Sequence, residues 1–400
     1  MQPHIIKEII DKEKKSSPLC NLLKLFISRG ASTIPELSKS MGVSLPTATK
    51  ALNELMAKGI VKEVGKRDNS MGRVPTVYDL IPTSGYFIGI DPGISSLILG
   101  LSDFCGNIID TKAVLFQHED SPANFEKLAQ IIEHYVDGLS IDKSKILNIC
   151  MNVAGRVNPQ VGSAYGYYTW MDEPLAQAMS SKLGYPFSID NDTRSMAYAE
   201  YVKGCSKGLK NVVFVNIGWG LGMSMIIDGK LYFGKSGYSG EFGHMHAYNN
   251  GVICHCGKIG CLETEVSGMA LIKKLTKQLQ DGRKSVLSDK VVGRKEALTL
   301  QDVLEAIARE DVLCVEALQN VADELGKSLA GIINIFNPEM LVIGGDLSVT
   351  GDYLTLPVSM GIKKYSLNVV NEDSQIVSSA LKEKAGLIGA CLMARYRLLV

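Results

Sequence analysis

The sequence predicts an α/β protein with two similar lobes, preceded by a small module of helices and a β-hairpin. Strand and helix patterns alternate from residue 86 to the end, which is typical of sheets covered by helices. The pattern of strand, glycine turn and strand at 86–109 recurs at 211–230, which indicates a duplicated lobe. Residues 1–80 hold 13 lysines and arginines against 8 acidic residues, although the whole chain is neutral. The leading module therefore differs in charge from the remainder.

Composition limits the class of protein. A hydrophobic content of 46% is globular, and 400 residues predict two or three domains. No apolar run reaches membrane-spanning length, and the polar amino terminus lacks the apolar core of a secretory signal. We therefore expect a cytoplasmic protein without membrane insertion. Nine cysteines are an odd number, so free thiols and a metal site fit this chain better than a disulfide framework.

The leading module begins with three predicted helices. Apolar residues recur at helical spacing over 19–27. Thr33 and Glu36 form a capping box that opens a second helix, Gly42 makes a turn, and Ser44 caps a third helix. The inward face of the third helix is expected to comprise Leu45, Ala48, Leu52, Leu55 and Met56.

Two short helices joined by a glycine turn form the helix-turn-helix pattern of DNA-binding proteins. The outward face of the third helix carries groups suited to phosphates and base edges, namely Ser44, Thr47, Lys50 and Asn53. Strands are expected at 60–64 and 74–80, and the loop between them places Arg67 and Arg73 among glycines, like a basic wing. The alternatives are a dimerisation module for the helices and an ordinary solvated face for the charges.

Both lobes are predicted from strand and helix patterns after a linker at 82–85. In the first lobe, strands are expected at 86–91, 146–155 and 186–192, a hairpin turn at 103–107, and helices at 125–137, 175–183 and 196–202. In the second lobe, the strands and turns at 211–230 precede a segment over 271–300 that is helical and then charged, and that is expected to be a surface excursion. A helix at 313–336, a strand at 340–343 and a final helix at 386–399 follow. The expected domains are 1–82, 83–200 with 384–400, and 201–383.

Residues 237–263 contain the densest cluster of reactive groups. The cluster offers His244, Cys254, Cys256 and Cys261. One imidazole and three thiolates suit a closed, four-coordinate zinc site of the structural type. His246 and His255 are alternatives to His244, and the spacing does not decide between them; four unrelated buried residues are the alternative without a metal. Glu241 and Glu263 flank the cluster, so a metal here would hold a loop that carries carboxylates.

The run GYSGEFGHMH followed by CHCGKIGCLE resembles the signature of the ROK family of repressors, open reading frames and kinases. The resemblance extends over residues 84–400, and the leading module resembles the winged helix of the repressor branch. It implies two lobes of the actin-like ATPase fold, also called RNase-H-like, with a sugar in the cleft and a final helix packed on the first lobe.

The resemblance also implies roles for particular residues. It implies structural Zn²⁺ on His244, Cys254, Cys256 and Cys261. It implies sugar contacts from Asn191, Asp192, Glu241, His244 and Glu263. Asp192 matches the general base of the family's kinases, and a carboxylate can also hold a sugar hydroxyl without catalysis.

Two loops depart from the kinase pattern. Family kinases have Asp-x-Gly-Gly-Thr after the first strand, whereas this chain keeps Asp91 and Gly93 and continues with isoleucine. The second phosphate loop, usually Gly-Thr-Gly, is Gly218-Trp219-Gly220. Because phosphoryl transfer depends on the positioning of phosphates, we expect no ATP cofactor and no enzymatic activity.

The sequence therefore predicts a transcriptional regulator of the repressor type that binds operator DNA and a carbohydrate effector as a homodimer or homotetramer. One alternative is a sugar kinase with an added DNA-binding module. Another is a regulator that binds a transporter component in place of the sugar. The aromatic run YGYYTW at 165–170 replaces an asparagine common in the family, so the identity of the sugar is not predicted.

Overall fold

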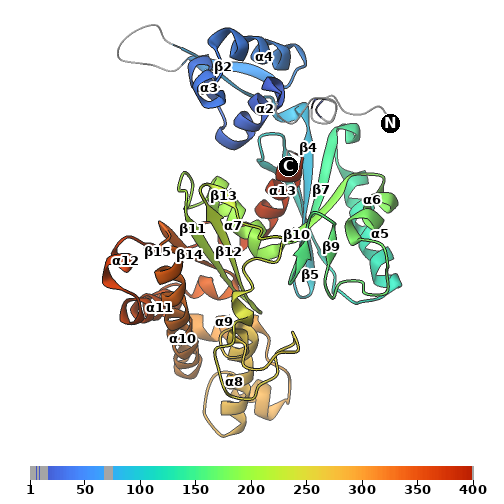
Figure 1. The fold of residues 1–400 in the computed structure, drawn as a ribbon. Coiled ribbons are helices and arrows are strands. Elements are labelled where there is room, and N and C mark those ends of the chain that lie inside the picture. Colours follow the sequence, from blue (N-terminus) through green and yellow to red (C-terminus); the bar gives the residue numbers. More distant parts are fainter. Residues whose placement is uncertain (1–5, 7–8, 10–16, 67–74, 399–400) are drawn as a thin grey trace. The chain divides into compact units, whose positions relative to one another are not determined.

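A computed structural model describes residues 6, 9, 17–66 and 75–398. The chain divides into two compact units, unit 1 with residues 1–195 and 386–400, and unit 2 with residues 196–385. The chain crosses between the units within α7 (Asp192–Lys203) and at the start of α13 (Ala385–Arg397) (Figure 1). The three predicted domain boundaries stay a prediction, since the leading module falls within unit 1. Among the described residues, no helix has the length and apolar character needed to span a bilayer.

Over residues 17–66 and 75–80, the leading module contains three helices and a small antiparallel sheet. The helices are α2 (Pro18–Arg29), α3 (Ile34–Met41) and α4 (Leu45–Ala57), and the strands β1 (Ser32–Thr33), β2 (Val61–Lys66) and β3 (Thr76–Leu80) pair in the order β1-β3-β2. The predicted helix starts are confirmed. The carboxylate of Glu36 accepts hydrogen bonds from the backbone N–H and the hydroxyl of Thr33 at 2.8 and 2.9 Å. Ser44 caps α4 and accepts from the N–H of Thr47.

The predicted inward face of α4 is wrong at both of its ends. The buried stripe comprises Ala48, Ala51, Leu52 and Leu55. Leu45 and Met56 are 52% and 36% exposed. With 100° between successive residues, Leu45 and Met56 project just beyond Leu52, at the edge of the stripe opposite Ala51, where they are exposed.

Unit 1 also contains a five-stranded sheet in the order β10-β7-β4-β5-β6. Its strands are β4 (Tyr86–Pro92), β5 (Ser96–Asp103), β6 (Ile108–Leu115), β7 (Ile146–Val153) and β10 (Phe187–Asn191). Strands β10, β7 and β4 run parallel, and β4, β5 and β6 form antiparallel hairpins. A short hairpin, β8 (Val157–Asn158) with β9 (Ser163–Ala164), follows β7.

Helices cover both faces of this sheet. On one face, α5 (Pro122–Gly138) and α6 (Leu175–Leu183) pack against a core that includes Ile88 and Ile90. The intervening Gly89 points to the other face, where a Cβ atom would lie 2.6 Å from the backbone nitrogen of Cys391. Glycine at position 89 therefore permits α13 to lie directly on the strand.

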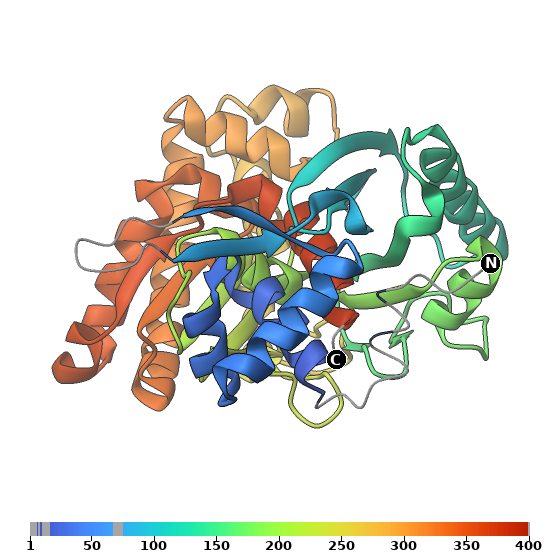
Figure 2. The same ribbon diagram turned by 90° about the horizontal axis from the view of Figure 1, so that it is seen from above.

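Unit 2 is built around a second five-stranded sheet in the order β13-β12-β11-β14-β15. Its strands are β11 (Val212–Ile217), β12 (Leu221–Ile227), β13 (Lys230–Leu231), β14 (Met340–Gly344) and β15 (Gln375–Ser378). Its helices are α8 (Gly268–Gln280), α9 (Leu300–Ala308), α10 (Val312–Phe336), α11 (Asp352–Tyr365) and α12 (Asn368–Glu372). Helices α10 and α11 lie side by side (Figures 1 and 2), and a Cβ at Gly326 would be 2.4 Å from the carbonyl oxygen of Val358.

The helical start predicted for residues 271–300 is confirmed by α8, but the prediction that this segment is a surface excursion is wrong. Apolar residues from this segment enter the core of unit 2, namely Leu271, Leu275, Leu279, Leu287, Val291 and Leu298. Only the first three share one helical period, within α8. The others lie on a π-helical turn (Asp289–Gly293) and its flanks, so no single period marks them as buried in the sequence.

Candidate metal centre and ligand-binding residues

Three thiols and one imidazole come together in the segment that joins β13 to α8. The ligand atoms of His244, Cys254, Cys256 and Cys261 all lie within 4.8 Å of one another. The Sγ atom of Cys254 is 3.7 Å from Nδ1 of His244, and the Sγ atoms of Cys256 and Cys261 are 3.6 Å apart. The predicted cluster is thus present, and its donor set is that of a closed zinc site.

Tight turns bring the cysteines of this cluster together. The N–H of Gly257 donates to the carbonyl of Cys254 at 2.9 Å, and the N–H of Cys254 donates to the carbonyl of Lys258 at 2.7 Å. Gly260 has a φ of 72°, and a Cβ there would lie 1.9 Å from the carbonyl oxygen of Tyr248. Any side chain at position 260 would therefore displace the backbone that carries Cys261.

The chemistry of the cluster fits a bound cation. Burial, together with the hydrogen bonds and charges of the neighbouring thiols, raises the pKa of Cys261 to about 12. Thiolates, which are the metal-binding form, are therefore unfavourable here unless a cation neutralises them. A Zn²⁺ ion bound here would neutralise the three thiolates, so the residues present fit the metal that their spacing predicts.

The geometry also bears on which histidine belongs to the cluster. A second, overlapping group consists of Cys254, His255 and Glu263, in which Nδ1 of His255 is 3.1 Å from Oε1 of Glu263. The side chain of His255 is 62% exposed. Among the described residues, His246 belongs to neither group, although its backbone pairs with Cys261. The four-residue group around His244 is thus the fuller donor set.

Two predicted sugar-binding carboxylates flank the cluster. Glu241 lies 3.8 Å from Nε2 of His244. Glu263 is buried, and its Oε2 accepts a hydrogen bond from the N–H of Leu221 at 2.9 Å. A Cβ at Gly220 would lie 2.8 Å from the same oxygen. The glycine of the second hairpin therefore makes room for this carboxylate.

Asn191 and Asp192 lie in unit 1, at the junction of β10 and α7. The side-chain amide of Asn191 donates to the carbonyl of Gly155 at 3.0 Å. An oxygen of Asp192 accepts from the N–H of Thr193 at 2.6 Å. Burial raises the pKa of Asp192 to about 6, against the opposing effects of the Thr193 hydrogen bonds and the charge of Arg194. The other three predicted sugar residues, Glu241, His244 and Glu263, belong to unit 2. The predicted sugar residues thus form two groups, one within each unit.

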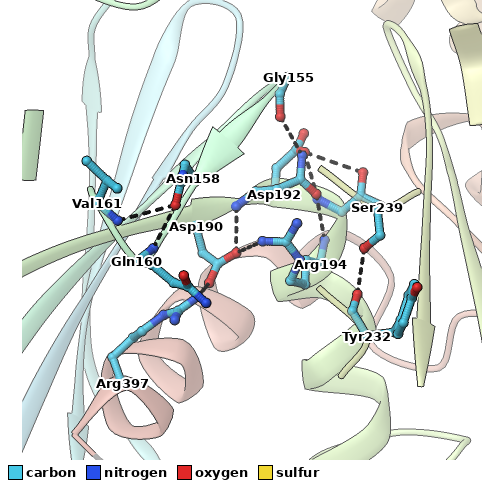
Figure 3. Close-up of polar contacts among 12 residues, drawn as sticks. Gly155, Asn158, Gln160, Val161, Asp190, Asp192, Arg194, Tyr232, Ser239 and Arg397 are labelled. Carbon is cyan, nitrogen blue, oxygen red and sulfur yellow. Dashed lines mark hydrogen bonds and ion pairs between the residues drawn. The ribbon is translucent and has the colours of Figure 1, made fainter. Parts of the chain in front are cut away.

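An ion network beneath Asn191 and Asp192 was not predicted. Asp190 is fully buried and forms ion pairs with Arg194 on α7 and with Arg397 on α13 (Figure 3). The spacing of Asp190 and Arg194 by four residues was a signal in the sequence, but Arg397 is remote along the chain. The network fixes the strand end that carries the two candidate ligand residues.

The two loops that depart from the kinase pattern are tight hairpin turns. Between β4 and β5, the N–H of Gly93 donates to the carbonyl of Ser96 at 2.8 Å, and Ile94 is 58% exposed. Asp91 accepts from the side-chain amide of Asn152 at 2.8 Å. The carboxylate of Asp91 is therefore hydrogen-bonded to a side chain of the same lobe.

The second loop is held by the start of α8. The N–H of Gly268 donates to the carbonyl of Gly218, and the N–H of Met269 donates to the carbonyl of Trp219. The side chain of Trp219 is 45% exposed. The first amides of α8, which in many proteins bind phosphate, are thus used by this hairpin.

A model of the ROK family matches residues 87–397. The chain belongs to the ROK family. The resemblance that the sequence carries is confirmed, and so is the predicted fold class of two α/β lobes with a leading helical module. The histidine and cysteines described above lie in the second lobe of this ROK domain.

Similar proteins include both regulators and kinases. The chain is 28% identical to the xylose repressor of Caldicellulosiruptor bescii, covering 93% of this chain and 94% of the repressor. It is 30% identical to the glucokinase of Streptomyces coelicolor, covering 78% of this chain and 98% of the kinase. Among solved structures, a ROK family transcriptional regulator homologous to the E. coli MLC protein has 27% identity and a TM-score of 0.80, covering 96% of this chain and 97% of that regulator.

The ROK chain exposes all four predicted DNA-contacting residues that the structure describes. These are Ser44, the N-cap of α4, and Thr47, Lys50 and Asn53 on the helix itself. The hydroxyls of Ser44 and Thr47 are 2.9 Å apart, so both take part in capping the helix. The other two predicted contacts, Arg67 and Arg73, lie outside the described residues.

Proposed function

We propose that this ROK protein is a sugar-responsive transcriptional repressor of the cytoplasm. The observation that carries the proposal is the leading module of three helices and a hairpin, which precedes the ROK domain and presents an exposed polar stripe on α4. Regulators match this chain almost from end to end, whereas 98% of a glucokinase matches only 78% of it. The portion of this chain that the glucokinase does not match is about the size of the leading module.

The module is proposed to bind operator DNA through α4. Lys50 and Asn53 are exposed there and suited to phosphates and base edges. Arg67 and Arg73 are proposed to extend the contact from the wing. Two modules in a homodimer or homotetramer would read two half-sites, which multiplies affinity and specificity.

The ROK domain is proposed to bind Zn²⁺ and a carbohydrate effector. Bound Zn²⁺ would be held by His244, Cys254, Cys256 and Cys261, where it would cross-link the loop and neutralise the thiolates. The sugar hydroxyls would be bound by Asn191, Asp192, Glu241, His244 and Glu263. Asp192 is expected to be the strongest hydrogen-bond acceptor for a sugar hydroxyl in unit 1, because its carboxylate charge is half-buried.

A sugar kinase is the second candidate. It is favoured by the 30% identity to a glucokinase and by the pKa of Asp192 near 6, which suits a general base at neutral pH. It is disfavoured by Ile94 and Trp219, whose exposed side chains stand in the two hairpins where the family's kinases have glycine and threonine, because phosphoryl transfer depends on the positioning of phosphates. A transporter component that binds the regulator is a further proposed partner.

The proposed function is tested with the zinc-loaded full chain and a randomised duplex DNA library. Repeated selection should enrich a palindromic sequence, which the protein binds more tightly than bulk DNA at physiological salt. Addition of the effector should then change the affinity for that sequence by about 5–150-fold, the usual range of coupling between two sites. Equal affinity for selected and bulk DNA would refute the repressor.

A further inference from the structure

Helix α11 of unit 2 has an exposed face with apolar side chains at its centre. Leu356 and Met360, one helical turn apart, are 60% and 70% exposed. The opposite face of the helix is buried in the core of unit 2 and comprises Leu354, Val358, Gly361 and Ile362. A single exposed leucine is ordinary in a folded protein, whereas adjacent exposed apolar side chains are typical of interaction sites. The exposed face of α11 is therefore a candidate interface.

Charges of opposite sign lie at the two ends of this face. Asp352 is in the first turn of α11, Lys363 and Lys364 are in its last turn, and all three are exposed. The interval of four residues places Asp352, Leu356, Met360 and Lys364 in one row along the helix. The helix dipole favours an acid at the start and bases at the end, but it does not explain the two apolar side chains exposed between them. The row thus reads acid, apolar, apolar, base.

This row is complementary to a second copy of itself. If two copies of α11 pack antiparallel about a two-fold axis level with Val358, Asp352 lies opposite Lys364 of the second copy. In the same register, Leu356 lies opposite Met360 of the second copy, because both pairs of positions are centred on residue 358. Rows of residues four apart interdigitate in the commonest class of helix packing. A two-fold contact makes each of these pairs twice, so a modest attraction is doubled.

We propose that the exposed face of α11 is an interface between two copies of this chain, packed antiparallel about a two-fold axis. The inference rests on the proposed function, which includes a homodimer or homotetramer, and it names the surface that joins the copies. The order of charges along the row is the observation that selects a second copy as the occupant. A face with charges of one sign would repel itself, whereas Asp352 and Lys364 attract each other across the axis.

Further exposed apolar residues follow and precede α11 along the chain. A stable interface buries about 800 Å² on each partner, which is more than one helical row supplies. Val349, just before α11, is 49% exposed, and Leu367 and Val369, just after it, are 63% and 70% exposed. The N–H of Leu367 donates to Oδ1 of Asn334 on α10 at 2.9 Å, so this end is held to unit 2. Antiparallel packing brings the end with Leu367 toward the end of the second copy that carries Val349.

The interface is tested by sedimentation equilibrium of the purified full chain. One chain has a mass of 43.4 kDa, so the wild-type protein should sediment with at least twice that mass. Leu356→Asp places a charge at the centre of the contact and should halve the mass found for the wild type; because Leu356 is exposed, the fold of each copy is retained. The control Lys273→Asp reverses an exposed charge on α8 and should leave the mass unchanged.

The antiparallel register is tested by exchange of charges. Asp352→Lys places lysine against lysine, and Lys363→Asp/Lys364→Asp places acid against acid. Each of these variants alone should have a dissociation constant for self-association about 10-fold above that of the wild type, because like charges then face each other twice. An equimolar mixture of the two variants joins a basic end to an acidic end at both contacts, and should associate within about 3-fold of the wild type. A misfolded variant would not regain association in the mixture.

The outcomes separate this inference from the proposed function. A monomeric wild-type chain overturns the inference, and so does an oligomer that Leu356→Asp leaves intact. A mixture of the charge variants that associates no better than either variant alone overturns the antiparallel register. A monomer that binds the selected palindromic DNA and responds to the effector overturns this inference alone. An oligomer that Leu356→Asp dissociates, but that prefers no DNA sequence, supports the α11 interface and refutes the repressor.

Discussion

Replacement of Asp192 by asparagine should stabilise the protein and weaken its ligand site together. Asp192→Asn keeps an oxygen that can accept from the N–H of Thr193, but it removes the negative charge. Because burial raises the pKa of Asp192 from its ordinary value of 3.8 to about 6, the folded protein holds the charged form less well than the unfolded chain does. The charge therefore costs free energy of folding at neutral pH.

The magnitude and its pH window follow from that pKa. A rise from 3.8 to about 6 corresponds to about 3 kcal/mol at most, at 1.36 kcal/mol for each pH unit. The side chain is only half-buried by accessible surface, so solvent screening reduces the effect to about 1–2 kcal/mol. The cost is absent below about pH 4, grows as the pH rises to about 6, and is constant above it. The advantage of Asp192→Asn should thus grow by about 1 kcal/mol between pH 5 and pH 7.5.

The two tryptophans of the chain permit a clean assay, since Trp170 lies in unit 1 and Trp219 in unit 2. In a Trp219→Phe background, fluorescence during urea unfolding reports on unit 1, which contains Asp192. Asp172→Asn, which changes an exposed carboxylate in the same unit, is the matched control and should leave the pH dependence unchanged. An Asp192→Asn variant that is less stable than its parent at pH 7.5, or whose advantage does not vary with pH, would refute the reasoning.

Three further predictions concern the metal, the DNA and the kinase alternative. The purified protein should contain about one equivalent of zinc by elemental analysis, and the Cys261→Ser variant should lose it. The control variant Cys314→Ser, which changes a buried cysteine outside the cluster, should retain the zinc. Wild-type protein without zinc would contradict the site. Lys50→Ala should weaken operator binding about 10-fold and flatten its salt dependence by about one charge, unlike Lys143→Ala in the ROK domain; equal affinities would disprove the role of α4. With Mg-ATP and the tightest-binding sugar, no sugar-dependent ADP release is expected, and turnover that Asp192→Asn abolishes would establish the kinase instead.

The parts of the fold that the sequence predicts well have strong local patterns. The helix over 175–183 was predicted at the bounds that the structure has, because its apolar spacing ends at a glycine that caps it in the left-handed conformation. The metal cluster was also found from sequence, since three cysteines and a histidine within 18 residues have few other uses in a chain without disulfides. Local spacing was sufficient in both cases because the residues involved are close along the chain.

Long-range contacts account for most of what was not predicted. The ion pair of Asp190 with Arg397 joins residues 207 positions apart, and the stack of His118 on Tyr167 joins a strand end to a distant loop. Helix α11 contains Pro357, and β15 has only four residues, so neither shows the pattern of its class. Periodicity reports which face is buried, but it carries no information on which partner buries it.

Two neighbouring carboxylates illustrate how a strand end can separate structural and ligand-binding roles. Asp190 faces two guanidinium groups, so its charge is compensated within the folded protein. Asp192, two residues later, receives hydrogen bonds from Thr193, and burial raises its pKa against the opposing charge of Arg194. The charge of Asp192 lowers the free energy of unfolding of the protein without ligand. A ligand hydroxyl that donates a hydrogen bond to this charge can offset that loss on binding. The same buried charge therefore links the stability of unit 1 to its affinity for the proposed sugar.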